Sequence, residues 1–186
     1  MALRIITGII GVIIAGVAIQ VGGAVFSGFA ILLALVAWFE YANAFGRAGL
    51  EISFFLGAFT LILMLCCAWL GNIEELLAVL TLGSLAIFLL TVLLSMRPHE
   101  AGVSVAGLLY LGLPFSHLIM LRFLADEPHK VESLVNLHTF IGENVGNINF
   151  VESLSNLNFD GGCELVWILF ACTWASDTFA YFIGSA

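Results

Sequence analysis

The stretch from Ile5 to Phe39 constrains the fold most, because Gln20 is its only strongly polar side chain. As one helix, this stretch would be about 52 Å long at about 1.5 Å per residue, whereas the hydrocarbon core of a bilayer is about 30 Å thick. The paired glycines Gly22 and Gly23 follow Gln20 and permit a tight turn. The sequence therefore predicts two short membrane-spanning helices in place of one, at about Ile5–Ile19 and Ala24–Phe39.

Four further apolar runs are separated by short polar connectors at residues 40–51, 71–75 and 97–100 and by a long polar segment. Pro98 biases Arg97 away from helical geometry. Pro114 lies inside the fifth run, where a proline removes a backbone hydrogen bond and kinks a helix. We expect Ser116 or His117 to satisfy the carbonyl that Pro114 frees. The four additional spans are predicted at about Phe54–Leu70, Leu76–Leu94, Val103–Phe123 and Leu165–Gly184.

Composition places the chain among integral membrane proteins. Hydrophobic residues make up 62% of it and charged residues 10%, with a mean hydropathy of +1.14, whereas a soluble domain carries about 25% charged residues. We therefore predict an all-α, polytopic membrane protein in which residues 1–186 form one transmembrane domain of about six helices. The net charge of −8 and the scattered basic residues exclude a nucleic-acid-binding surface. The four cysteines lack a C-x-x-C spacing and are expected to be packed thiols, not metal ligands.

Residues 125–163 break the apolar pattern with a polar, acidic segment. It contains a near-repeat, V-E-S-L-x-N-L, at residues 131–137 and 151–157. Each copy is compatible with a short amphipathic helix on the membrane surface, and a duplicated insertion in a tolerant loop is the favoured interpretation. Arg4, Arg47 and Arg97 outnumber Arg122 and Lys130 in the two sets of alternating loops, which predicts a cytoplasmic N-terminus.

Asp177 is the strongest candidate for chemistry, because it lies well inside the last apolar run. A charge at the centre of a span costs about 2.5–3.5 kcal/mol on insertion scales, so such residues usually face a cavity or a partner. Small or polar residues share its helical face: Thr173, Ala180, Tyr181 and Gly184. Asp177 is predicted to be a ligand of Mg²⁺, with partner acids from elsewhere. The alternatives are a proton or organic-ligand contact, or pairing with a Thr or Tyr hydroxyl for packing.

Other polar side chains carry weaker signals. Glu40, next to Tyr41, is an interfacial acid beside an aromatic anchor. His117 is expected to be a satisfied core histidine, and His99, beside Arg97, a solvated loop residue. The roles of Glu40, His99 and His117 stay open at this point. The sequence contains no nucleophile-elbow or Walker-type glycine motif.

Three segments resemble one enzyme family. Residues 174–184, WASDTFAYFIG, resemble the W-x-x-D-[ST]-x-A-Y-x-x-G segment of bacterial phosphatidate cytidylyltransferases, also called CDP-diacylglycerol synthases. Arg4-Ile5-Ile6-Thr7-Gly8 resembles the start of that family, and Glu40-Tyr41 its acidic-aromatic pair.

The resemblance implies an enzyme of the inner membrane that joins CTP and phosphatidate into CDP-diacylglycerol and pyrophosphate with Mg²⁺. Its expected partners are CTP, phosphatidate and the lipid bilayer, with a homodimer as an open arrangement. The family's downstream signature, with Lys-Asp, His-Gly-Gly and Asp-Arg-x-Asp, does not occur in these residues. The chain is therefore expected to be an N-terminal portion that is inactive by itself, and no catalytic residue is assigned. A small membrane transporter or channel subunit, with Asp177 as a proton or cation site and Pro114 as a hinge, is the alternative. A membrane scaffold is a third hypothesis.

Overall fold

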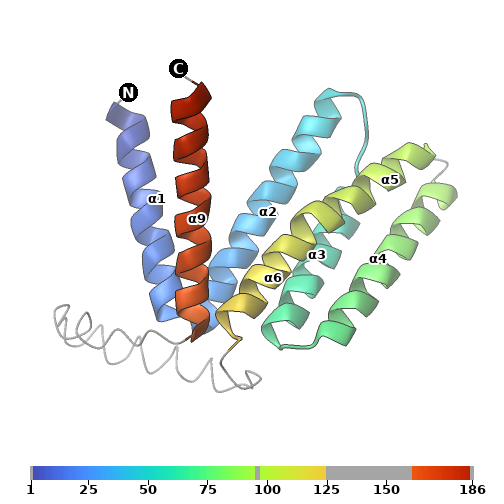
Figure 1. Ribbon diagram of the computed structural model, residues 1–186. Helices are drawn as coiled ribbons and strands as arrows, with labels where there is room; N and C mark the ends of the chain where they lie inside the picture. Colours follow the sequence, from blue (N-terminus) through green and yellow to red (C-terminus); the bar gives the residue numbers. More distant parts are fainter. Residues whose placement is uncertain (1, 95–96, 125–160, 185–186) are drawn as a thin grey trace, which may run out of the picture. The chain divides into compact units, whose positions relative to one another are not determined.

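The computed structural model describes residues 2–94, 97–124 and 161–184, and these residues form helices and no strand (Figure 1). The prediction of an all-α fold is confirmed. The acidic segment at 125–160, with its near-repeat, His129 and His138, lies outside the described residues. The helices are α1 (Ala2–Val21), α2 (Gly23–Arg47), α3 (Phe54–Trp69), α4 (Ile73–Leu93), α5 (Pro98–Gly107), the π-helical turn η1 (Leu108–Gly112), α6 (Leu113–Arg122) and α9 (Gly161–Gly184).

Three helical segments in the described part of the chain are long and apolar enough to cross a bilayer: Gly23–Arg47, Ile73–Leu93 and Pro98–Arg122. The shorter apolar helices Ile10–Val21 and Phe54–Trp69 account for two further predicted spans. The protein is thus a helical membrane protein. Helix α9 occupies the position of the sixth predicted span, and it contains Glu164 and Asp177.

The first predicted turn is confirmed at the paired glycines. Helix α1 ends at Val21, and the backbone dihedral φ is 63° at Gly22 and 51° at Gly23. This left-handed region is favourable for glycine and costly for other residues.

Helix α2 does not end near Phe39 as predicted but continues to Arg47. Its last two turns are polar enough to suggest a connector, yet they contain no proline and continue the helical hydrogen bonding. The chain reverses instead at Gly49, where φ is 77°. The predicted connector at 40–51 is therefore wrong over its first eight residues.

The fifth span begins earlier than predicted. Arg97 is extended, with a ψ of 135°, as expected for a residue before proline, and Pro98 is the first residue of α5. The predicted loop at 97–100 is therefore largely the first turn of a helix. Proline is tolerated there because the first N–H groups of a helix have no partner within the helix.

The irregularity expected at Pro114 appears as the π-helical turn η1, directly before it. The predicted compensation is wrong. The Nδ1 atom of His117 is hydrogen-bonded to the carbonyl oxygen of Leu113, 2.7 Å away, and not to a carbonyl one turn before Pro114. The buried hydroxyl of Ser116 has no hydrogen-bond partner among the described residues. A π-turn lets the backbone skip a hydrogen-bonding position instead.

The chain forms two compact units. In its described residues, unit 1 contains 2–26, 121–124 and 161–184, and unit 2 contains 27–94 and 97–120. In unit 1, α1 and α9 lie side by side (Figure 1). Gly16 of α1 lies against the indole of Trp167, so a side chain at position 16 would meet that ring.

Trp38 of α2 is the centre of the core of unit 2. It is fully buried, and its indole N–H donates to the carbonyl oxygen of Phe54, 3.1 Å away. Gly57 of α3 and Gly107 of α5 both lie directly against its ring. The absence of a side chain at these two glycines lets α3 and α5 approach the same aromatic residue closely.

Candidate functional site

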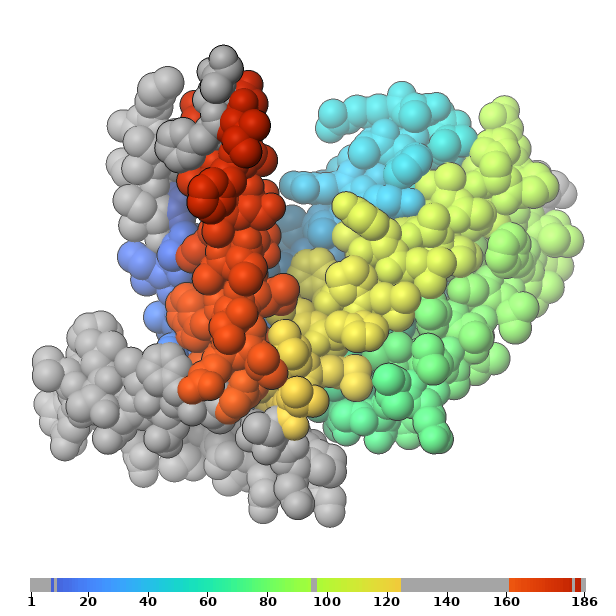
Figure 2. Space-filling model, viewed as in Figure 1, coloured from blue at the N-terminus to red at the C-terminus, as the bar shows by residue number. Residues whose placement is uncertain are grey.

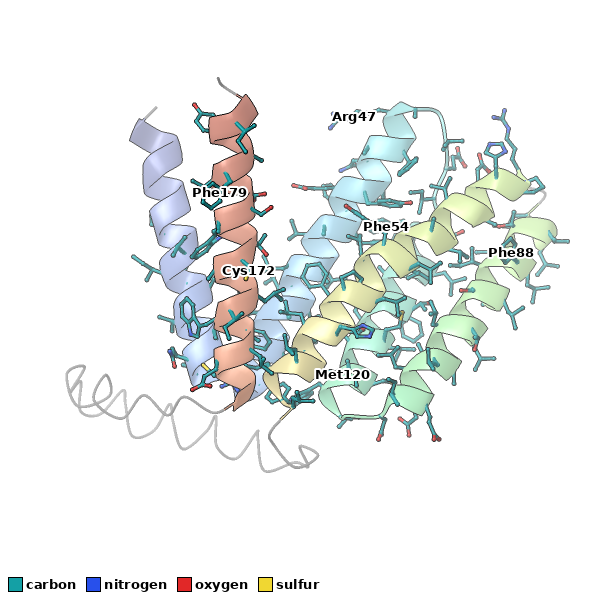
Figure 3. The ribbon with its side chains drawn as sticks, viewed as in Figure 1. Arg47, Phe54, Phe88, Met120, Cys172 and Phe179 are labelled. Carbon is teal, nitrogen blue, oxygen red and sulfur yellow. The ribbon has the colours of Figure 1, made fainter. Side chains whose placement is uncertain are left out.

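Asp177 lies in a part of α9 that the rest of the described chain leaves open. The first turns of α9 are anchored by the buried residues Gly162, Cys163 and Val166, whereas residues 171–181 are all exposed. Figure 2 shows this C-terminal half of α9, in red, open on the visible face, and Figure 3 labels Cys172 and Phe179 on it. The carboxylate of Asp177 has no hydrogen bond or ion pair within the described residues.

The threonines near Asp177 do not hold its carboxylate. The hydroxyl of Thr173 donates to the carbonyl oxygen of Leu169 at 2.8 Å, and that of Thr178 donates to the carbonyl oxygen of Trp174 at 2.7 Å. A hydroxyl has one proton, so neither can also donate to Asp177. The alternative in which a threonine pairs with Asp177 for packing is therefore wrong for both residues.

The described residues contain no group of three or more His, Cys, Asp or Glu side chains that could hold a metal ion. Asp177 is thus not part of a cluster of metal-ligating side chains in that part of the chain. Mg²⁺ in proteins is usually bound by one or two carboxylates together with waters and substrate phosphates. Asp177 fits one such ligand position, and the described residues supply no second one beside it.

The base of α9 is positioned by the ends of α1 and α6. Gly162 lies against the backbone carbonyl of Arg122, where a side chain would collide with the main chain. The thiol of Cys163, fully buried, lies 3.7 Å from the amide oxygen of Gln20. Gly162 therefore allows a close approach of the backbones of α6 and α9, which holds the first turn of α9 in place.

Arg122, which in the sequence contributed only to the count of charges that sets the orientation, is buried in the structure. Its side chain is 4% exposed, and its Nε donates to the carbonyl oxygen of Ile19 at 3.0 Å. Its guanidinium carbon lies 6.0 Å from the centre of the Phe123 ring, which packs edge-on against Phe26. A cation at the C-terminus of α1 is favourable because the last carbonyls of a helix carry partial negative charge.

A second polar cluster joins α5 to the connection between α2 and α3. The carboxylate of Glu100 is 7% exposed and accepts hydrogen bonds from the backbone N–H groups of Arg97 at 3.0 Å and Glu51 at 3.5 Å. The Ser104 hydroxyl accepts from the backbone N–H of Ser53 at 3.1 Å. Sequence analysis missed Glu100 because it was assigned to a loop. Its signal was a glutamate two residues after a proline, in the first turn of a helix.

Glu40 and Tyr41 face different surroundings. The Tyr41 hydroxyl donates to the carbonyl oxygen of Val103 at 2.9 Å, and its ring stacks on Trp38 with a centroid separation of 5.9 Å. Glu40 is exposed. Consecutive residues on a helix are rotated by about 100°, so the two members of this pair cannot line the same surface. Tyr41 is half-buried and packs on the core residue Trp38, whereas Glu40 is a surface acid.

The two histidines that were open in the sequence are both exposed. His99 lies in the first turn of α5 and not in a loop. His117 is satisfied by Leu113, as expected, but it lies on the surface and not in the core. Neither approaches a second metal-ligating group in the part of the chain that the structure describes.

An open pocket of about 530 Å³ lies where α2 ends. Asn43 and Glu51 are the only side chains in its wall with hydrogen-bonding or charged groups. The wall consists of Phe39, Ala42, Asn43, Gly46, Gly49, Leu50, Glu51, Ile52 and Phe54.

A comparison with known families decides the class of the protein. The model of the cytidylyltransferase family matches residues 2–186. The chain belongs to the cytidylyltransferase family. The resemblance carried by the Asp177 segment, Arg4-Gly8 and Glu40-Tyr41 is therefore confirmed at the level of the family. This cytidylyltransferase is a CTP-utilising transferase, in the class of nucleotidyltransferases.

No curated protein and no solved structure matches this cytidylyltransferase chain. Its family therefore rests on the family model and on the motifs, and its fold on the structure described above.

Proposed function

We propose that the protein transfers the cytidylyl group of CTP to phosphatidate, giving CDP-diacylglycerol and pyrophosphate. The observation that carries this proposal is the family match over residues 2–186 in a chain whose described part contains three helices able to cross a bilayer. A CTP-utilising transferase with such helices is suited to an acceptor that is itself a membrane lipid. Phosphatidate, a lipid with a terminal phosphate, is an acceptor of this kind.

In this reaction a phosphate oxygen of phosphatidate attacks the α-phosphorus of CTP. A new P–O bond forms, the bond between the α-phosphorus and the bridging oxygen to the β-phosphorus breaks, and pyrophosphate leaves with the electron pair. Both substrates are anions, so the site must neutralise negative charge as they approach. Positioning and charge neutralisation are the main tasks of a protein in phosphoryl-group chemistry of this type.

We propose Asp177 as a ligand of Mg²⁺ and Mg²⁺ as the cofactor. When bound, the ion would supply positive charge to the phosphate oxygens. The exposed carboxylate of Asp177 supports this role, because it has no competing hydrogen bond or ion pair among the described residues. The buried base of α9, at Gly162 and Cys163, would hold that carboxylate in place.

The location proposed for the enzyme is the inner membrane, with the N-terminus and the Asp177 end of α9 toward the cytoplasm. The arrangement of arginines supports it, because Arg47 and Arg97 flank the α2–α3 connection and the start of α5. These two segments lie at one end of unit 2, joined by the hydrogen bond from Glu51 to Glu100. The homodimer stays a prediction.

The test is an acceptor-dependent assay in membranes from cells that express the complete gene product. Labelled CTP is supplied with Mg²⁺ and with phosphatidate, diacylglycerol or phosphatidylglycerol, and label in the lipid extract is measured together with pyrophosphate. We expect labelled lipid and equimolar pyrophosphate with phosphatidate only. Labelling with another acceptor, or none above membranes from cells without the gene, would overturn the proposed substrate.

A further inference from the structure

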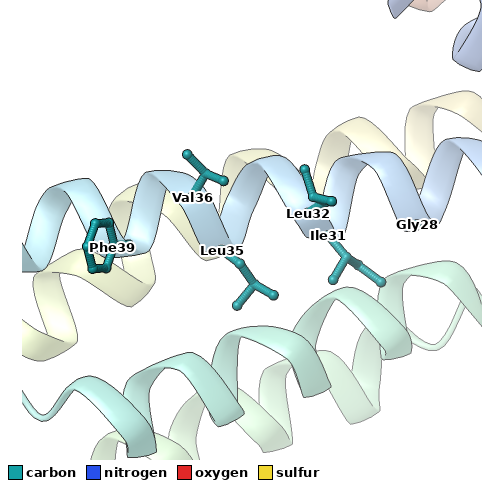
Figure 4. A pocket seen from close by; sticks show the side chains of 6 residues that line it. All are labelled: Gly28, Ile31, Leu32, Leu35, Val36 and Phe39. Carbon is teal, nitrogen blue, oxygen red and sulfur yellow. The ribbon is translucent and has the colours of Figure 1, made fainter. Parts of the chain in front are cut away.

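An apolar groove runs along one face of α2 (Figure 4). Its six lining residues recur at steps of three and four and therefore lie on successive turns of the same face. Every lining residue is apolar, and the groove, which is open on one side, has a volume of about 390 Å³. Leu32 is 58% exposed and Phe39 55% exposed, so described residues do not cover it. The residues are Gly28, Ile31, Leu32, Leu35, Val36 and Phe39.

The length of this groove matches half a bilayer. From Gly28 to Phe39 the helix rises about 16 Å, at about 1.5 Å per residue, and the hydrocarbon core is about 30 Å thick. Helix α2 is one of the helices that can cross the membrane. Gly28 widens the far end, because a side chain placed there would meet nothing within 4 Å. A single acyl chain of one leaflet has the shape and polarity that this groove accepts.

The groove and the pocket at the end of α2 are neighbours, because Phe39 lines both. The pocket is larger, about 530 Å³, and its wall includes the side chains of Asn43 and Glu51. An apolar groove one leaflet long therefore ends beside a pocket with polar groups at the end of a membrane-spanning helix. A lipid has this division between chain and headgroup.

The polar groups of the pocket select the charge of that headgroup. Glu51 is the only charged side chain in its wall, and it is exposed. Three backbone N–H groups of the wall already have acceptors: Gly49 donates to Gly46 at 3.1 Å, Leu50 to Phe45 at 3.1 Å, and Glu51 to the carboxylate of Glu100 at 3.5 Å. The side chains of the wall offer an anion only the neutral amide of Asn43, and they offer a cation the carboxylate of Glu51.

We propose that this surface binds a membrane lipid with a primary ammonium headgroup, with the ammonium on Glu51 and one acyl chain between Phe39 and Gly28. This lipid is distinct from the phosphatidate substrate, whose headgroup is an anion without an amine. The site goes beyond cytidylyl transfer and does not depend on the proposed acceptor.

Native mass spectrometry of the detergent-purified protein tests the site. The protein is mixed with equal amounts of phosphatidylethanolamine, phosphatidylcholine, phosphatidylglycerol and phosphatidate that carry the same acyl chains. We expect phosphatidylethanolamine to be retained at least about fivefold over the other three, as a partly exposed charge pair predicts. Phosphatidylcholine is the informative comparison, because its quaternary ammonium has no N–H to donate to Glu51.

Two variants locate the binding. Glu51→Gln should abolish the preference for phosphatidylethanolamine while leaving the backbone bond to Glu100 intact, since that bond uses the N–H of residue 51. Val36→Trp should fill the groove and lower retention of phosphatidylethanolamine. The matched control is Leu33→Trp, on an exposed position of α2 outside the groove. Unfolding of each variant is followed in the same detergent.

The proposal is overturned if the wild-type protein retains all four lipids equally or prefers phosphatidate. It is also overturned if Glu51→Gln keeps the preference for phosphatidylethanolamine, or if Val36→Trp and Leu33→Trp behave alike. A dimer that excludes lipid and that Val36→Trp dissociates would assign the groove to a second copy of the chain instead. The wild-type comparison decides the question even if a variant fails to fold.

Discussion

The Nε of Arg122 donates a hydrogen bond to the backbone carbonyl oxygen of Ile19, 3.0 Å away. This bond ties the end of α6 to the last turn of α1, although the two residues are far apart in the sequence. The guanidinium also lies against Gly22, the first glycine of the turn into α2. The side chain of Arg122 thus links the end of α6 to the turn after α1. The backbone carbonyl of the same residue lies against Gly162, at the start of α9.

Replacing Arg122 should destabilise the protein. Arg122→Met keeps much of the apolar length of the side chain but leaves the Ile19 carbonyl without its donor. Loss of a hydrogen bond from a charged group costs about 1.5–3 kcal/mol. Thermal unfolding of the detergent-purified variant should show a clear drop in Tm. The control is Arg47→Met, at an exposed position; equal Tm values for the two variants would contradict the structural role of Arg122.

Gly22 and Gly23 form a matched pair that separates backbone strain from crowding. Both have positive φ, so alanine at either position should cost about 1–2 kcal/mol from the backbone alone. At Gly22 the added Cβ also meets the buried guanidinium of Arg122, whereas at Gly23 it meets nothing within 4 Å. Gly22→Ala should therefore lower the free energy of unfolding by about 1–3 kcal/mol more than Gly23→Ala. Chemical unfolding of both variants measures the difference, and no difference would show that Arg122 moves aside without cost.

Gly107 and Gly102 of α5 should respond to alanine with opposite signs. Gly107 is buried against Trp38 and Tyr41, so the added methyl group overpacks the core and should cost about 1–3 kcal/mol. Gly102 is exposed, with nothing within 4 Å, so alanine there should stabilise the helix by about 0.4–1 kcal/mol. Thermal unfolding of the two variants checks the sign. A destabilising Gly102→Ala would mean that another surface covers this face of α5.

Asp177→Asn should lower cytidylyl transfer if the carboxylate binds Mg²⁺. The substitution keeps the size of the side chain and removes its charge, so we expect activity to fall by at least about tenfold. Part of the loss should be restored by raising the concentration of Mg²⁺. Glu164→Gln, in the exposed first turn of the same helix, is the control and should retain activity. Turnover near the wild-type value in Asp177→Asn would show that the acid has no part in catalysis.

The proposed orientation predicts which residues of unit 2 a membrane-impermeant reagent can label from the outer side of the membrane. Glu74, in the first turn of α4, and His99, in the first turn of α5, are both exposed and are separated by α4. With a cytoplasmic N-terminus, Glu74→Cys should react with a membrane-impermeant maleimide in spheroplasts, and His99→Cys should react only after permeabilisation. The parent protein, with its native cysteines, supplies the background labelling. The reverse pattern would invert the topology.

Properties that depend on neighbours along the chain could be predicted from the sequence. The apolar runs predicted helices, the glycine pair at positions 22 and 23 predicted the first turn, and the motif around Asp177 indicated the family. Helix ends were less accurate, because α2 continues through polar residues to Arg47 and α5 begins at Pro98. A proline at the first position of a helix and a proline in a loop give the same local pattern.

Contacts between helices were decided only by the tertiary structure. The sequence does not show which groups Arg122, Glu100 and Tyr41 bind. Their partners lie in other segments of the chain: Ile19, Glu51 and Val103. A charged residue near the end of an apolar run is compatible with exposure and with burial, and the free energy of each depends on which backbone groups come within reach. Helical periodicity determines which residues share a face, whereas packing determines what that face meets. For this reason the sequence by itself determined the helices and the family, and the fold decided which of their polar residues are held inside the protein.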